Sequence, residues 1–447
     1  MPTWVHSLAV VIAILFALLV GPSSLSAEDW PTFLGPRHNS TSNETNLLSQ
    51  WQEGGPKVLW QRKLGTGYGI GSISDGKFFQ FDRYDDANRL VVLDAKTGEE
   101  LWTYEYPTQY DDYLDYNNGP RCSPIIDGDR VYLYGAEGEL HCVSIPEKKL
   151  LWKRNLSQEY MVVPNFFGVG SSPVIFQDKL LVMVGGSPEK FQGLGPYDID
   201  RVDGNGSGIV ALDKLTGKEI YKLSDELASY ASLTLAEING RPWCFAFMRG
   251  GLVGFDPRDG KIDFHYPWRA KKLESVNAST PVVVGDEVFI SECYGVGSTF
   301  LKVKPGGYEV VWKDEQQSRE RAMETHWNTA VYQDGYLYGS SGRHPHQAEL
   351  RCIEWKTGKV NWSVPGMARC SLLAADRHLY CLSEYGKLTL IQTNPRSFQP
   401  VSETTLKDEQ GHELLKYPAW AAPILSEGRL YVRGDDRLVC LEVSANR

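Results

Sequence analysis

Short apolar runs separated by turn residues recur along most of the chain. In "CSPIIDGDRVYLY", residues 122–134, two apolar runs flank an Asp-Gly turn. This pattern predicts a β-hairpin, because Asp-Gly readily adopts the backbone conformation that joins two antiparallel strands. Eight hairpins of this kind are predicted, at residues 70–81, 122–134, 171–184, 232–247, 279–291, 328–340, 370–383 and 422–433.

A second element follows the hairpins and ends in a large aromatic residue. In "LVVLDAKTGEELW", residues 90–102, an apolar run, a turn and another run lead to Trp102. The Asp94 side chain can accept backbone N–H groups of the turn, and Gly98 can take the positive φ that such a turn requires. We expect the closing aromatics to dock between neighbouring repeats, where each can bury roughly 150–250 Å². They are Trp60, Trp102, Trp152, Tyr221, Phe264, Trp312 and Trp362, and a degenerate copy covers residues 391–401.

Together the two elements form a repeat of four short strands. The closing positions of successive copies are 39 to 69 residues apart and mostly 42 to 50, which is the period of propeller blades. The segment "KVLWQRKL" (57–64) looks like a fourth strand without a third, and "DDRLVCLEV" (435–443) looks like a third strand without a fourth. The pattern therefore predicts an all-β fold, an eight-bladed β-propeller of four-stranded antiparallel blades that closes by pairing its N- and C-terminal strands. Residues 185–208 form an insertion in the third blade.

The N-terminal part of the chain differs from the repeats. Leu8 to Val20 is an uninterrupted apolar run, and small residues follow it as far as Ala27. This arrangement predicts a signal peptide over residues 1–27, with an uncleaved anchor as the alternative. Residues 28–55 are then an N-terminal extension that we expect to lie across one face, and residues 56–447 form the propeller. The expected location is periplasmic or secreted, with no stable membrane span after cleavage.

Composition narrows the range of partners. The formal net charge of −10 argues against binding to the phosphate backbone of a nucleic acid. The eight cysteines are widely spaced and include no CxxC pair, which argues against a zinc site. Cys370 and Cys381 flank one predicted hairpin and could face each other, although cysteine in an apolar strand more simply serves as a small buried hydrophobe.

Several turns carry a motif of a known family. The pattern Ala-x-Asp-x-x-Thr-Gly-x-x-x-Trp resembles the tryptophan-docking motif of pyrroloquinoline quinone (PQQ) alcohol dehydrogenases and their non-enzymatic relatives. Residues 211–221 match it with Tyr in place of Trp, and residues 94–102 and 357–362 match it in part. The resemblance covers about residues 56–445. The segment "DWPTFLGPRHNSTS" (29–42) also looks like the mature start of exported bacterial PQQ-like repeat proteins, which are similar to BamB, the propeller of outer-membrane β-barrel assembly.

The resemblance implies a non-catalytic binding or interaction scaffold, with a quinone-dependent oxidoreductase as the alternative. Quinoprotein dehydrogenases need PQQ, Ca²⁺ or a similar ion, an Asp base and usually a disulfide of adjacent cysteines. This chain has no adjacent Cys pair, so we expect no cofactor, with PQQ and Ca²⁺ as the alternative. The expected partners are other envelope proteins or an extracellular ligand, and the expected state is a monomer. Trp and Tyr in the loops also suggest sugar or polyphenol binding.

Candidate binding residues follow from propeller geometry. We name the four strands of each repeat A to D; the D–A and B–C loops then share one face around the mouth of the central channel. Arginine and aromatic side chains there would suit an anionic, planar ligand, unless the loop arginines pair with acidic residues across blades. The candidates are Arg121, Asn277, His326, Trp327, Asn328, Arg369 and Trp420 in D–A loops and Arg343 in a B–C loop. Further polar residues of the B–C loops are Arg83, Arg249, Glu292, His344, Glu384 and Arg433.

Two other patterns touch on metal binding. His344 and His346 are spaced so that both imidazoles can face one side, and His326 belongs to the same repeat, but no carboxylate or cysteine completes a recognisable ligand set. Residues 203–208 place Asp, Asn and Ser at alternate positions as calcium loops do, but the twelfth position is Lys214. We therefore predict no metal site, and no catalytic residue can be assigned.

Overall fold

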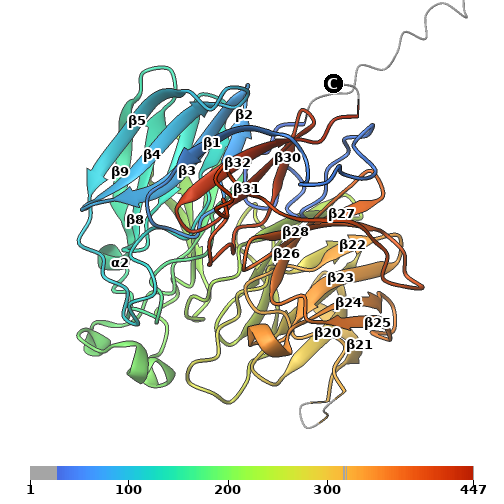
Figure 1. The fold of residues 1–447 in the computed structure, drawn as a ribbon. Helices are drawn as coiled ribbons and strands as arrows, with labels where there is room; N and C mark the ends of the chain where they lie inside the picture. The colour runs from blue at the N-terminus through green and yellow to red at the C-terminus, as the bar shows by residue number, and fades with distance from the viewer. Residues whose placement is uncertain (1–27, 316–317, 319, 446–447) are drawn as a thin grey trace, which may run out of the picture.

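The computed structural model describes residues 28–315, 318 and 320–445. These residues form eight four-stranded antiparallel sheets arranged around a central axis, so the predicted eight-bladed β-propeller is confirmed (Figure 1). The predicted signal peptide, residues 1–27, lies outside the described residues. Among the described residues, no helix is long and apolar enough to cross a membrane.

Each blade begins at the channel with its strand A and ends at the periphery with its strand D. The strands of blades 1 to 4 are β2 (Ser72–Ser74), β3 (Lys77–Tyr84), β4 (Ala87–Asp94), β5 (Glu100–Pro107); β6 (Ile125–Asp127), β7 (Arg130–Tyr134), β8 (Glu139–Ser144), β9 (Lys149–Asn155); β10 (Val174–Phe176), β11 (Lys179–Met183), β12 (Ile209–Asp213), β13 (Glu219–Leu223); β14 (Thr234–Ile238), β15 (Arg241–Phe247), β16 (Gly251–Phe255) and β17 (Ile262–Pro267).

Blades 5 to 8 repeat this arrangement, and the last blade takes its outer strand from the start of the chain. Their strands are β18 (Val282–Val284), β19 (Glu287–Glu292), β20 (Gly297–Lys304), β21 (Gly307–Lys313); β22 (Val331–Gln333), β23 (Tyr336–Ser341), β24 (Glu349–Glu354), β25 (Val360–Pro365); β26 (Cys370–Ala375), β27 (His378–Ser383), β28 (Lys387–Gln392), β29 (Pro400–Thr405); β30 (Ile424–Ser426), β31 (Arg429–Arg433), β32 (Arg437–Glu442) and β1 (Val58–Lys63).

The two ends of the ring meet as predicted. Strand β1 pairs antiparallel with β32, and Trp60 lies opposite Cys440. The blue strand and the red strand lie side by side in Figure 1. Closure in this way leaves no unpaired edge between the first and last blades, which removes a site at which another chain could add a strand.

The docking motif has a direct physical explanation in the structure. The Trp60 Nε1 donates to the backbone oxygen of Ala95 in the next blade, at 3.2 Å. The Asp94 carboxylate accepts the backbone N–H groups of Lys96 and Thr97 and so holds the turn that presents this oxygen. Gly98 has a φ of +73°, and a Cβ there would lie 2.6 Å from the Trp60 ring, so both its conformation and its contact require glycine.

The same kind of contact recurs in blades 2, 3, 5 and 6. The Nε1 atoms of Trp152, Trp312 and Trp362 donate to backbone oxygens of the following blade at 2.9–3.2 Å, and the Tyr221 hydroxyl donates to Pro257 at 2.7 Å. Phe264 has no such donor, and its ring lies 5.2 Å from that of Tyr308.

Blade 7 departs from the motif. The degenerate copy ends at Val401, but the strand register places Ser402 at the docking position, opposite Leu390 and beside the bulge that all copies share. Trp51, from the N-terminal extension, fills this place. Its backbone N–H donates to the Ser402 hydroxyl at 2.8 Å, and its ring lies 6.4 Å from that of Tyr380. The equivalent pair of blade 8, Trp60 and Tyr431, is 5.8 Å apart.

The N-terminal extension also contacts the innermost strands of blades 1, 2 and 7. Trp30 forms a bridge with Ile73 of β2, and Thr41 forms one with Ala374 of β26. Between them, the backbone oxygen of Pro31 accepts the N–H of Ile126 in β6. Three innermost strands are therefore bound by residues 30–41, on the side of the A–B turns.

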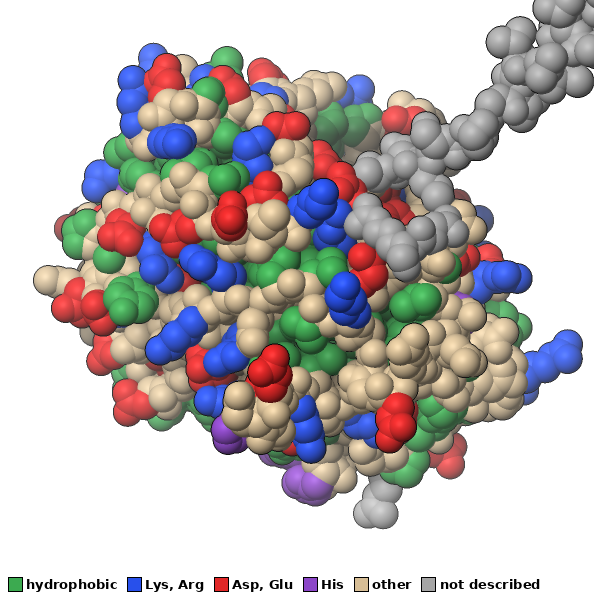
Figure 2. Space-filling view, turned by 45° about the horizontal axis from the view of Figure 1, so that its top comes forward, with side chains coloured by type: hydrophobic (Ala, Val, Ile, Leu, Met, Phe, Trp, Pro, Cys, Tyr) green, Lys and Arg blue, Asp and Glu red, His purple; other side chains and the backbone are tan. Residues whose placement is uncertain are grey.

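The few helical turns lie on the opposite face. They are α2 (Leu156–Glu159), η1 (Glu189–Phe191), η2 (Pro196–Arg201) and η3 (Pro345–Gln347), with η1 and η2 in the insertion of blade 3. The green insertion and α2 lie low in Figure 1, below the labelled strands β2 and β30. On the surface shown in Figure 2, acidic and basic side chains are interspersed and form no continuous patch of one sign.

Candidate functional site

A cavity of about 710 Å³ occupies the mouth of the channel on the D–A face. All eight D–A segments contribute to its lining, together with B–C loops of blades 3, 5 and 6. Phe33 and Leu34 of the N-terminal extension also line it, so the segment that binds the A strands of blades 1, 2 and 7 reaches the cavity.

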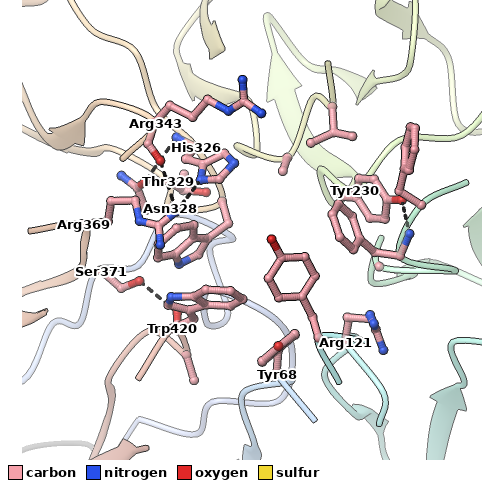
Figure 3. A pocket seen from close by; sticks show the side chains of 18 of the residues that line it. Tyr68, Arg121, Tyr230, His326, Asn328, Thr329, Arg343, Arg369, Ser371 and Trp420 are labelled. Atoms are coloured by element: carbon pink, nitrogen blue, oxygen red, sulfur yellow. Dashed lines mark hydrogen bonds between the residues drawn. The ribbon is translucent and has the colours of Figure 1, made fainter. Parts of the chain in front are cut away.

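Seven of the eight candidate residues meet in this cavity. Arg121, His326, Trp327, Asn328, Arg343, Arg369 and Trp420 line it. Figure 3 shows His326, Asn328, Arg369 and Trp420 gathered on one side, with Arg121 and Tyr230 on the other. Asn277 is not part of the lining: its side chain is buried and its amide donates to the backbone oxygen of Met248 at 2.7 Å.

Arg369 is the best-anchored charge of the site. Its Nε donates to Glu384, whose carboxylate is fully buried, at 2.9 Å. The Trp420 Nε1 donates to the same carboxylate at 3.3 Å. The guanidinium lies over the Trp327 ring, 4.2 Å from its centroid. Hydrogen bonds and stacking together fix the orientation of the guanidinium before any ligand arrives.

His326 is held as a neutral imidazole between two partners. The Arg369 Nη1 lies 3.2 Å from His326 Nδ1, and the Tyr294 hydroxyl lies 3.3 Å from Nε2. Because arginine can only donate, Nδ1 accepts and the ring proton lies on Nε2. Removal from water lowers the His326 pKa to about 3, and the nearby positive charges of Arg369 and Arg343 act in the same direction.

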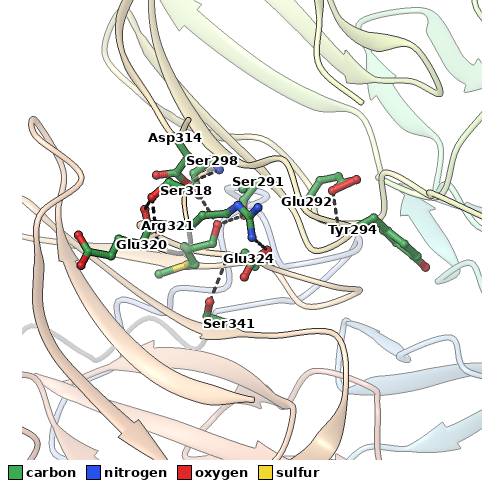
Figure 4. Close-up of polar contacts among 12 residues, drawn as sticks. Ser291, Glu292, Tyr294, Ser298, Asp314, Ser318, Glu320, Arg321, Glu324 and Ser341 are labelled. Carbon is green, nitrogen blue, oxygen red and sulfur yellow. Dashed lines mark hydrogen bonds and ion pairs between the residues drawn. The ribbon is translucent and has the colours of Figure 1, made fainter. Parts of the chain in front are cut away.

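The segment that carries His326 is itself clamped. The Ser291 hydroxyl donates to the Met323 backbone oxygen at 2.9 Å and accepts the Thr325 N–H at 3.0 Å. Asp314 accepts the N–H groups of Ser298 and Ala322 at 2.7 and 2.9 Å, and burial raises its pKa. Figure 4 shows these groups side by side. They hold the 320–325 segment against blade 5 and thereby position the imidazole.

Glu292 plays a similar part for Tyr294. Its carboxylate is buried and accepts the Tyr294 N–H at 2.7 Å and the Ser275 hydroxyl at 3.0 Å (Figure 4). Burial raises the Glu292 pKa. This residue lies behind the cavity wall, so it supports the Tyr294 ring without lining the cavity.

The remaining arginines of the lining also have acidic neighbours. Arg121 is bound to Asp112, whose side chain is fully buried. The Arg343 Nη1 lies 3.7 Å from Glu274, and its guanidinium lies over the Tyr294 ring at 4.5 Å. Arginine therefore pairs with a carboxylate within one loop at Arg121, within one blade at Arg369, and across blades at Arg343.

Aromatic rings form a continuous surface in the cavity. The Trp420 ring lies 4.7 Å from the Tyr68 ring and 4.8 Å from the Trp327 ring. On the opposite wall, the Tyr230 hydroxyl accepts the Phe167 N–H at 2.9 Å, which fixes that ring (Figure 3). These rings offer flat apolar faces beside a small number of polar groups, a combination typical of small-molecule sites.

Tyr68 and Tyr230 are the clearest of the lining residues that the sequence did not reveal. Tyr68 and Tyr230 lie in the D–A segments before β2 and β14, for which no candidates had been considered. The repeat itself could have pointed to these two residues, because a D–A segment precedes each hairpin and all eight such segments meet at the channel mouth.

The metal-related patterns have other partners. His326 uses both ring nitrogens as described, and His344 and His346 stack on each other with centroids 5.8 Å apart. Asn205 donates to the Ser187 backbone oxygen at 3.0 Å and accepts the Ser207 N–H at 3.2 Å, so the 203–208 segment ties the insertion together. Across the described ranges, no group of three or more His, Cys, Asp and Glu side chains could hold a metal ion.

The lining does not fit PQQ with its metal. Glu274 is the one carboxylate among the described residues of the lining. All eight cysteines are buried and free, and no two are adjacent in the sequence. The cavity thus lacks the carboxylate set for a calcium ion and the adjacent cysteines that the resemblance would require.

Comparison with known families gives one match over more than half of the chain. A family model described as "Outer membrane protein assembly factor BamB" matches residues 114–364. A curated relative, the quinoprotein ethanol dehydrogenase of Pseudomonas aeruginosa, is 27% identical over 157 residues, which cover 33% of this chain. The match spans only 21% of that relative's own length.

Solved structures share the fold at low sequence identity. The quinohemoprotein alcohol dehydrogenase from Comamonas testosteroni superposes with a TM-score of 0.52 at 13% identity, over 94% of this chain and 81% of that chain. The computationally designed Ika8 protein superposes with a TM-score of 0.53 at 11% identity, over 86% of this chain and 98% of that chain. These likenesses show the propeller fold alone, whereas the family model gives a match of the assembly-factor kind and the curated relative one of the quinoprotein dehydrogenase kind.

Proposed function

The chain belongs to the family of PQQ-like repeat propellers described as outer membrane protein assembly factor BamB, and we propose that it is a non-catalytic binding module. The binding site is the cavity at the channel mouth. In this proposal the protein is located in the periplasm or outside the cell, and its other partners are envelope proteins. The family description and the predicted signal peptide support this location.

The observation that carries the proposal is the preorganised aromatic cavity. Arg369 is fixed by Glu384 and by the Trp327 ring, and Trp420 is fixed by the same carboxylate. Phe33 and Leu34 add apolar side chains of the N-terminal extension to the walls formed by the blades. Rigid walls of this kind favour binding because little side-chain freedom is lost when the ligand enters.

A quinone-dependent oxidoreductase is the second candidate, and the quinoprotein ethanol dehydrogenase match favours it. That chemistry requires a metal and a general base beside the quinone. The lining offers one carboxylate, Glu274, which already lies 3.7 Å from Arg343. The residues present therefore favour binding over oxidation.

Thermal-shift measurements test the proposal. A panel of neutral sugars, aromatic acids, peptides and PQQ is added to the wild type, to Trp420→Ala and to Tyr84→Ala. Tyr84 is 54% exposed and lies outside the cavity, so it serves as the matched control. At least one compound should raise the melting temperature of the wild type and the control but not of Trp420→Ala, because only ligands bound to the folded state stabilise it. Equal shifts in all three proteins, or none in any, would contradict the proposal.

A further inference from the structure

We propose that the cavity and its rim bind a neutral oligosaccharide. This inference rests on the proposed function and names the chemical class of its ligand. Three features of the described residues carry it: an aromatic surface that continues beyond the cavity, the electrical neutrality of the lining, and polar groups that remain available.

The aromatic surface extends onto the exposed rim. Tyr113, Tyr116 and Tyr197 are 54%, 60% and 59% exposed on one side of the mouth. Tyr385 and Tyr417 are 52% and 48% exposed on the other side. Large rings exposed to this extent in a group indicate a recognition surface. Because Tyr197 belongs to blade 3 and Tyr385 to blade 7, the ligand contacts opposite sides of the ring and is longer than one small molecule.

The rim rings are arranged as platforms. The Tyr385 and Tyr417 rings are stacked 5.3 Å apart with an interplanar angle of 27°. The Tyr113 ring lies 5.6 Å from the Tyr197 ring in an edge contact, so each holds the other in place. A pyranose ring has one face of C–H groups and a rim of hydroxyls, so it can lie on such a ring and still keep its hydroxyls in contact with water and polar side chains.

The charges of the lining are compensated. The positive charges of Arg121 and Arg369 are balanced by the fully buried side-chain carboxylates of Asp112 and Glu384. Arg343 lies near Glu274. A strongly anionic ligand would therefore compete with carboxylates that cannot leave, whereas a neutral ligand meets no such competition.

Polar groups suited to hydroxyls remain available in the same cavity. The side chains of Arg343 and Glu274 are 33% and 51% exposed, so their forks can each bind a pair of vicinal hydroxyls. The Trp327 indole N–H is buried and has no hydrogen-bond partner within the described part of the chain. Because the Trp327 ring lines the cavity, a ligand oxygen can reach this buried N–H only if the ring shifts.

Calorimetric titration of the full chain tests the inference. The probes are maltohexaose, cellohexaose, mannohexaose and hexa-N-acetylchitohexaose, with hexagalacturonate as the anionic counterpart. We expect at least one neutral probe to bind and hexagalacturonate not to bind. Trp420→Ala and the double variant Tyr385→Ala/Tyr417→Ala should each weaken binding by about tenfold or more, while Tyr84→Ala binds as the wild type does. Trp420→Phe keeps an aromatic ring at this position. If it binds better than Trp420→Ala, the loss in Trp420→Ala comes from lost stacking and not from misfolding.

The outcomes separate the two proposals. If no neutral probe binds, or if binding is the same in Trp420→Ala, the oligosaccharide inference is wrong. If in that case a peptide or an aromatic acid still stabilises the wild type but not Trp420→Ala, the binding function stands with another ligand. If nothing depends on Trp420, both proposals fall together.

Discussion

Removing one partner of a buried ion pair at the channel mouth should cost far more stability than removing one partner of an exposed pair at the periphery. Arg369 is 8% exposed and its partner Glu384 is fully buried. If either side chain were removed, water could not readily take its place beside the other. Lys387 and Glu403 form an ion pair in the same blade with side chains 46% and 43% exposed. The two pairs differ mainly in burial, and burial decides what the loss of one partner costs.

Replacing Glu384 by Ala should therefore lower the free energy of unfolding by about 3–5 kcal/mol, because it leaves a buried guanidinium without its partner. Replacing Glu403 by Ala should cost only about 0.2–1 kcal/mol, as is usual for exposed pairs. Urea denaturation of both variants measures the difference. Equal losses in the two variants would show that the Arg369 pair is not buried as described.

His326 makes the stability depend on pH. Its pKa is lowered from 6.5 to about 3, so between these values the unfolded chain binds a proton that the folded protein does not. Stability should therefore fall as the pH is lowered through this window, by at most about 1.4 kcal/mol per pH unit for this group. His326→Gln, which keeps an acceptor for Arg369, should show a shallower dependence in denaturation experiments at a series of pH values. Identical slopes would mean that His326 takes up its proton without unfolding.

Among the larger elements, the N-terminal extension completes the ring in two places. It supplies Trp51 where Ser402 occupies the docking position, and it links β2 of blade 1 with β26 of blade 7. Residues 51 and 402 are far apart in the sequence, so no local pattern could reveal this substitution. The docking motif itself is local, which is why Trp60 and Trp312 were predictable.

Trp51→Ala should destabilise the protein by about 3–5 kcal/mol, the usual cost of removing a buried Trp, and Trp362→Ala should cost a similar amount at the neighbouring blade. Trp51 is 7% exposed, so its removal leaves a cavity between blades 7 and 8. Chemical denaturation of the two variants and of Trp51→Phe makes the comparison. A loss below about 1 kcal/mol for Trp51→Ala, as for a surface residue, would mean that the extension only covers the ring and does not complete it.

For the molecule as a whole, the ring of eight blades can be predicted from the sequence, whereas the environment of the site residues cannot. Unmatched strands at the two ends were enough to predict the pairing of β1 with β32. The face of the candidate residues followed from propeller geometry, but their environment did not. Asn277 lies in the expected segment and yet turns into the wall, and Tyr68 lies in a segment without any motif. Side-chain direction in a loop depends on packing against other blades, which a single sequence does not reveal.

Reconstitution with PQQ tests most directly whether this propeller binds without catalysis. The purified full chain is incubated with PQQ and CaCl₂, and both Ca²⁺-dependent retention of PQQ in equilibrium dialysis and alcohol-dependent dye reduction are measured. The lining contains one carboxylate, Glu274, so neither retention nor dye reduction should exceed that of Trp420→Ala. Ca²⁺-dependent retention of PQQ together with alcohol-dependent dye reduction, both lost in Trp420→Ala, would contradict the account and identify the mouth as an oxidoreductase site.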